Sequence, residues 1–313
     1  MGTPEFAVET LKALVENDYN VVAVVTQPDK PVGRHQTEMQ PSQVKQYAVA
    51  HGLPVLQPEK MKDPEFVEQL RSYTANLQVV VAFRMLPEAV WAMPEYGTFH
   101  VHAALLPPYR GAAPINWAVI NGETQTGVTT FFLDHDIDTG RIILKKTFDI
   151  PDEADVEYVY DGLMHLGAEI CLETLEAIIA ANGHPDSIPQ DSVLDGSAIK
   201  PAPKIFKETC EIDWQKTAKQ VYDFVRGLSP YPGAWTTLVA PDGKETVLKI
   251  YKTRKTGKPG KGIGTITIEG KALCVSAADE QLEIVELQLA GKKRMMARDF
   301  LNGMKQIEDY RVK

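Results

Sequence analysis

Short apolar runs alternate with amphipathic segments along the first half of the chain. The apolar and β-branched runs predict strands at residues 19–26, 53–56, 77–82, 98–102, 127–133 and 141–148, of which 19–26 and 77–82 are typical of buried strands. Apolar residues at helical spacing predict helices at 5–17, 41–51, 63–72, 87–93, 112–121 and 155–181. This alternation predicts a doubly wound, mostly parallel α/β sheet with helices on both faces.

The pattern changes after residue 185. A segment rich in Pro, Asp and Ser reads as a linker, and one helix is predicted at 217–226. Five short strands with Gly-rich turns follow at 234–238, 246–251, 263–269, 272–277 and 281–289, which favours a small OB-like β-barrel. The expected division is a catalytic domain at 1–185, a linker at 186–206 and a C-terminal domain at 207–313.

Composition places the chain among ordinary globular proteins. It has 313 residues, 44% hydrophobic and 24% charged, and no apolar run approaches the ~20 residues of a membrane helix. No cleavable signal is visible. The three cysteines, Cys171, Cys210 and Cys274, fit neither a metal spacing nor a disulfide framework. These observations predict a cytoplasmic protein with no membrane partner.

Charge is divided unevenly between the two halves. The chain carries −9 overall, whereas residues 207–313 hold 19 basic and 14 acidic residues, a net of +5. A basic C-terminal part beside an acidic remainder suggests an anionic partner for the C-terminal part. An ordinary solvated surface is the alternative.

Titratable groups gather around the predicted strand at 98–102. Side chains alternate along a strand, so His100 and His102 share one face. The strand ends before Pro107, and a loop and helix follow, as in the ligand crevice of an open α/β sheet. Asp138 lies in a second loop, DHDIDTG. Three interpretations of these residues remain: acid–base chemistry, a metal site, or histidines and a carboxylate without a functional role.

The surrounding sequence resembles a known family. HVHAALLPPYRGAAPINWAVING, followed by LDHDIDTG, is similar to the N-formyltransferases that use 10-formyltetrahydrofolate, whose signature is Asn-x-His, Ser-Leu-Leu-Pro, Arg-Gly-Ala-Pro and Asp-Thr-Gly. MGTPEFAV, VTQPDKPVGR, VLQPEK, SPYPGAW and GKKRMMARDFLNG extend the resemblance over the chain, toward the methionyl-tRNA formyltransferases. The resemblance implies formylation of the methionine α-amino group on initiator tRNA, with 10-formyltetrahydrofolate as co-substrate and no metal. We expect a monomer.

The resemblance also implies roles for individual residues. His102 matches the catalytic histidine and would donate to the developing oxyanion; loss of such a donor typically costs ~10²–10³ in rate. Asp138 matches the family aspartate, which would fix the imidazole tautomer and help to remove the amine proton. His100 stands at the position of the catalytic Asn. The expected folate-binding residues are Ala104, Leu105, Leu106 and Pro107.

Basic residues are the candidates for tRNA contact. Arg34 matches a family loop that approaches the acceptor end of the tRNA. The C-terminal candidates are Lys252, Arg254, Lys255, Lys292, Lys293 and Arg294. On an OB-like barrel they would follow phosphates, with binding that falls steeply with salt. Solvated side chains without a partner are the alternative.

Three departures from the family pattern carry expectations of their own. His100 in place of Asn predicts a slower enzyme, or one whose rate falls more sharply with acid, because an imidazole becomes charged. Ala104 replaces Ser and lacks its hydroxyl. The sequence begins at the GTP turn, so most of the family's first, central strand is absent, and this predicts a domain less stable by several kcal/mol. A start site further upstream is the simple explanation.

Four other functions stay open on the sequence. Sugar-nucleotide N-formyltransferases share the N-terminal motifs, and hydrolysis of formyltetrahydrofolate is a related activity. A metal-dependent hydrolase could use His100, His102 and Asp138. The substitution at His100 also allows a catalytically impaired tRNA-binding homologue.

Overall fold

The computed structural model describes residues 1–33, 36, 38–194 and 199–313. Its contacts divide the chain into two compact units. The first unit comprises Met1–Gly111, Gln125–Asp149 and Tyr160–Pro201; the second comprises Ala112–Thr124, Ile150–Val159 and Ala202–Lys313. The second unit therefore includes two segments from before the expected linker. The assignment of catalysis to residues 1–185 and of tRNA binding to 207–313 stays a prediction.

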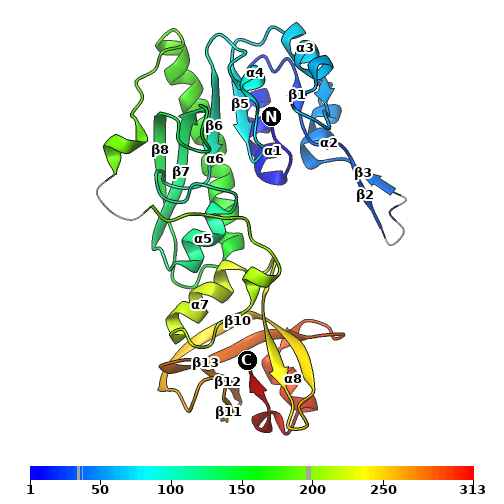
Figure 1. Ribbon diagram of the computed structural model, residues 1–313, viewed down its shortest axis with the longest axis vertical. Coiled ribbons are helices and arrows are strands. Elements are labelled where there is room, and N and C mark those ends of the chain that lie inside the picture. Colours follow the sequence, from blue (N-terminus) through cyan, green and yellow to red (C-terminus); the bar gives the residue numbers. More distant parts are fainter. Residues whose placement is uncertain (34–35, 37, 195–198) are drawn as a thin grey trace. The chain divides into compact units, whose positions relative to one another are not determined.

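The first unit contains a mixed sheet with the order β5 (Gln78–Val81), β6 (Thr98–His102), β7 (Gln125–Phe132) and β8 (Ile142–Asp149) (Figure 1). β5 and β6 are parallel, whereas β7 runs antiparallel to both β6 and β8. The α/β class is confirmed. The sheet is less parallel than expected because β7 runs antiparallel to both of its neighbours, and its connection to β8 contains no helix of the kind that a parallel crossover needs.

A second pair of strands belongs to the same unit. β1 (Val24–Val25) is parallel to β4 (Val55–Leu56), so the strand expected at 19–26 is much shorter than predicted. Met1 and Gly2 connect this pair to β5, because Gly2 N donates to Val25 O at 3.0 Å and Val81 N donates to Met1 O at 2.9 Å. A mostly apolar cavity of about 640 Å³ lies along these edges. The effect of this arrangement on stability stays a prediction.

The helices lie close to their expected positions. In and around the first unit they are α1 (Glu5–Glu16), α2 (Gln43–Ala50), α3 (Pro64–Ser72), α4 (Glu88–Trp91) and α6 (Val156–Ala180). Ser42 caps α2 by accepting from Lys45 N, and Asp63 caps α3 by accepting from Glu65 N. β2 (Lys30–Val32) pairs antiparallel with β3 (Glu38–Gln40), where the sequence predicted no strand.

The second unit is a curled antiparallel sheet with helices. Its strands are β9 (Ala234–Val239), β10 (Glu245–Pro259), β11 (Ile266–Glu269), β12 (Ala272–Ser276), β13 (Glu280–Leu289), β14 (Met295–Met296) and β15 (Arg311–Val312). The order is β11-β12-β13-β10-β9-β15, and a bridge between Thr265 and Arg311 joins its two ends. The OB-like expectation is confirmed as this half-barrel. The helices of this unit are α5 (Pro114–Ile120), α7 (Ala218–Gly227) and α8 (Ala297–Gly303).

Two global observations complete the fold. All three cysteines are free thiols with buried side chains. Among the described residues, no helix has both the length and the apolar character needed to cross a bilayer.

Candidate active site

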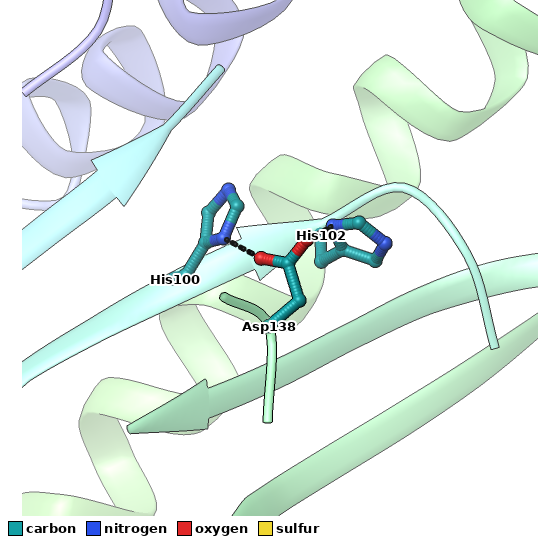
Figure 2. Close-up of side chains that lie close together, drawn as sticks. All are labelled: His100, His102 and Asp138. Carbon is teal, nitrogen blue, oxygen red and sulfur yellow. Dashed lines mark ion pairs between the residues drawn. The ribbon is translucent and has the colours of Figure 1, made fainter. Parts of the chain in front are cut away.

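β6 presents two imidazoles to one carboxylate, and Figure 2 shows all three side chains together. Nδ1 of His100 lies 3.6 Å from Oδ1 of Asp138, and Nδ1 of His102 lies 4.0 Å from Oδ2. Asp138 follows β7 in the loop between β7 and β8. The strand alternation and the loop thus bring together the three residues that the sequence singled out.

His102 is a buried, neutral imidazole. Its side chain is 3% exposed, and its Nε2 lies 2.9 Å from the carbonyl oxygen of Tyr109. A carbonyl only accepts, so we assign the proton to Nε2 and the lone pair to Nδ1. Burial lowers the pKa of His102 to about 4, against the opposing charge of Asp138. Tyr109, rather than the expected Asp138, therefore fixes the tautomer.

Asp138 is ionised at neutral pH. Burial raises its pKa, but the neighbouring imidazoles of His100 and His102 and the amide of Gly111 outweigh burial and lower the pKa to about 2. Gly111 N donates to Oδ2 at 3.0 Å. The backbone of Asp138 is left-handed, with φ of 56°, a conformation that Asp tolerates better than most residues.

His100 occupies the open side of the cluster. Its side chain is 17% exposed, and its ring packs edge-on against Phe131 with the centroids 5.3 Å apart. When Nδ1 of the neutral ring directs its proton at the Asp138 carboxylate, Nε2 has only a lone pair. Neutral His100 then cannot donate from Nε2, whereas a carboxamide at this position always can.

Gln190 is a residue that sequence reasoning missed. Its Nε2 donates to the carbonyl oxygens of Asp138 at 2.8 Å and Gly140 at 2.9 Å. Its Oε1 accepts from Nε and Nη2 of Arg110, at 3.1 and 2.7 Å. The side chain is buried, and these four hydrogen bonds satisfy both of its N–H donors and both acceptor positions of its oxygen. A single Gln in a Pro- and Asp-rich segment gives no signal in the sequence.

Backbone pairing places Gln190 beside the loop. Residues 190–193 form a 3₁₀ turn inside the segment that the sequence predicts as a linker. Just before it, Ile188 exchanges two hydrogen bonds with Ile142 of β8, at 2.8 and 2.9 Å. Part of the expected linker is therefore a structural component of the site.

The expected folate-binding loop is held by two side chains. Thr129 Oγ1 accepts from Leu106 N at 3.0 Å and donates to Ala104 O at 2.7 Å, while Lys145 Nζ donates to Leu106 O. Ala104, Leu106 and Pro107 are buried, and only Leu105 is partly exposed. The assignment of folate contact to this loop stays a prediction.

Some of the predicted tRNA-binding residues form ion pairs with carboxylates of the same chain, and others do not. Arg254 pairs with Glu283 at 2.9 Å, Lys255 with Asp152 at 2.7 Å, and Arg294 with Glu286 at 2.6 Å. Lys252, Lys292 and Lys293 are exposed, and no ion pair within the described chain includes them. Arg34 lies outside the described residues.

Comparison with family models matches both halves of the chain. The model described as formyl transferase matches residues 1–175, and the model described as formyl transferase, C-terminal domain, matches residues 204–305. The methionyl-tRNA formyltransferase of Parabacteroides distasonis is 58% identical over 317 residues, covering 100% of this chain and 97% of that protein. The methionyl-tRNA formyltransferase of Bacteroides fragilis is 54% identical and covers 100% and 96%.

Solved structures share the fold at low identity. WlaRD, a sugar 3N-formyl transferase determined with dTDP and 5-N-formyl-THF, aligns with a TM-score of 0.63 and 18% identity, over 93% of this chain and 97% of that one. HypX from Aquifex aeolicus in complex with tetrahydrofolic acid aligns with a TM-score of 0.55 and 21% identity, over 82% and 44%. At these identities the likeness concerns the fold alone.

Proposed function

The chain belongs to the formyl transferase family, and from this premise we propose that it transfers the formyl group of 10-formyltetrahydrofolate to the α-amino group of methionyl-initiator tRNA. The product would be N-formylmethionyl-tRNA for translation initiation. The observation that carries the choice of substrate is the 58% identity to a methionyl-tRNA formyltransferase along the whole chain. The sugar 3N-formyl transferase shares the fold at only 18% identity.

The site supports acyl transfer to an amine through one imidazole. A bond forms between the amine nitrogen and the formyl carbon, and the bond from that carbon to folate N10 breaks. An α-amino group has a pKa of about 8, so much of the nucleophile is already neutral near pH 8. Nδ1 of His102 has the free lone pair, and it can accept the proton that the attacking amine releases.

Asp138 would stabilise the imidazolium that results. Its carboxylate oxygen lies 4.0 Å from Nδ1 of His102, and its low pKa keeps it charged throughout the reaction. The new N–H of His102 can then donate to the oxyanion or return the proton to the leaving nitrogen. His102 therefore acts first as a proton acceptor, and it takes the expected role of hydrogen-bond donor only after it has been protonated.

We further propose that the folate ring binds near the Asp138 loop. A pocket of about 280 Å³ is lined by Met85, Leu86, Trp91 and His135, among others, and His135 belongs to the same loop as Asp138. A planar ring suits an apolar pocket with an aromatic wall. HypX was solved with tetrahydrofolic acid and WlaRD with a formylated folate, which supports the class of co-substrate.

The remaining parts of the proposal concern tRNA and cellular location. Within the described chain, Lys252 on β10 and Lys292 and Lys293 between β13 and β14 have no ion-pair partner, and we propose that they bind phosphates. We propose a monomeric enzyme in the cytoplasm, where charged initiator tRNA is available.

Incubation with 10-formyltetrahydrofolate and charged methionyl-tRNA tests the function. Initiator and elongator methionyl-tRNA would be compared, together with a dTDP-linked amino sugar, and acid-stable formyl products would be scored. We expect formylmethionine from initiator tRNA. Formylation of the sugar alone, or folate hydrolysis without formylmethionine, would contradict the proposal.

A further inference from the structure

We propose that His100, His102 and Asp138 bind a zinc-type divalent cation and that the bound cation blocks formyl transfer. The first part concerns the residues alone, whereas the second rests on the proposed function. The site depends on His100, which stands where the family signature given above has Asn.

The ligand atoms already converge. One ligand atom from each of the three residues lies within 4.8 Å of the other two. A tetrahedral zinc ion with bonds of about 2.0–2.2 Å holds its ligand atoms about 3.3 Å apart. The observed separations from Asp138 are 3.6 Å to His100 and 4.0 Å to His102, so these two pairs need to close by less than ~1 Å.

The groups around the cluster favour metal binding. Nε2–H of His102 donates to the carbonyl oxygen of Tyr109, which leaves Nδ1 as the ligand atom, and metal-bound histidines commonly have such a partner. Gly111 N donates to Oδ2 of Asp138 and orients the carboxylate. Two imidazoles and one carboxylate are a usual donor set for zinc, with a fourth position left for water.

His100 decides whether the site exists. With Asn at this position only one imidazole and one carboxylate remain, and an amide oxygen is a poor third ligand for zinc. The partly exposed His100 ring lies at the open side of the cluster, so it can adjust toward an incoming ion. The ion would occupy the Nδ1 lone pair of His102 and the Asp138 carboxylate, which the proposed reaction needs free.

Titration of the purified full-length protein with Co²⁺ tests the site without any activity measurement. We expect one equivalent of Co²⁺ to bind with the visible absorption of a four-coordinate ion. His100→Asn and Asp138→Asn should each weaken binding at least about 100-fold. His165→Asn is the matched control, because His165 is exposed and has a single carboxylate neighbour, Glu9, at 3.8 Å; it should bind like the wild type.

The outcomes separate the two parts of the proposal. Absence of Co²⁺ binding by the wild type, or equal binding by His100→Asn, would overturn the metal site whatever the enzyme's activity. With the site established, Zn²⁺ should inhibit formyl transfer by the wild type and not by His100→Asn, and a chelator should reverse the inhibition. Binding without inhibition would overturn the second part alone.

Discussion

Replacing His100 with Asn should accelerate formyl transfer. When the neutral imidazole directs an Nδ1 proton toward Asp138, 3.6 Å away, Nε2 has no proton to donate. An Asn amide at the same position always has an N–H for the oxyanion. The substitution should therefore add a second donor, beside the N–H that His102 gains during the reaction.

The magnitude follows from what one such donor contributes. An oxyanion donor accounts for about 2.7–4 kcal/mol, or ~10²–10³ in rate. At pH 8 an imidazole is mostly neutral, so we expect an increase in kcat of about 10²-fold. An imidazolium, unlike a neutral imidazole, donates from both ring nitrogens, so the increase should be smaller at lower pH.

Single-turnover formyl transfer at pH 6 and pH 8 is the assay. Saturating 10-formyltetrahydrofolate isolates the chemical step, and a chelator removes any metal that would slow the wild type for a different reason. His165→Asn serves as the control for loss of an imidazole elsewhere. If His100→Asn is no faster than the wild type at pH 8 in chelator, the reasoning about the missing donor is wrong.

Three further predictions concern the site, the stability and the RNA surface. Gln190→Glu keeps the acceptors for Arg110 but loses both donors to the Asp138 loop, so the free energy of unfolding should fall by about 1–3 kcal/mol and kcat should decrease. Gln190→Met should lower both the stability and kcat further. Urea unfolding and kcat that match the wild type would contradict this. Stability should decline as pH falls from 7 to 4, because burial lowers the pKa of His102 to about 4, so the unfolded chain binds more protons in this window; a urea midpoint that is constant from pH 7 to pH 4 would be inconsistent with it. Replacing Lys252 and Lys293 with Gln should reduce the slope of log K against log salt for tRNA by about 2, and Arg254→Gln, which removes a cation already paired with Glu283, should change it less.

Much of the site could be predicted because the positions of its histidines follow from the alternation of side chains along one strand. Strand alternation alone places His100 and His102 on one face, and the Pro107 break places them near the end of the strand. The position of Asp138 required the family resemblance, since its loop is distant in sequence and its left-handed backbone leaves no pattern.

The rest depended on tertiary contacts. Nothing in the sequence indicates that the carbonyl of Tyr109 fixes the tautomer of His102, or that Gln190 from the expected linker supports the Asp138 loop. Two of the candidate tRNA-binding residues are also less available than their sequence indicates, because Glu283 and Glu286, both on β13, pair with Arg254 and Arg294. The main strands of the half-barrel could be predicted from their period and turns, whereas the two-residue strands β14 and β15 and the extension of β10 to Pro259 could not.

The measurement that bears most directly on the mechanism is single-turnover formyl transfer by Asp138→Asn. The substitution keeps the size of the side chain and removes the charge that would stabilise protonated His102 at 4.0 Å. We predict a rate about 10²–10⁴-fold below that of the wild type, with methionyl-tRNA still bound. A rate within about threefold of the wild type would show that this carboxylate does not support the proton transfer and would contradict the account.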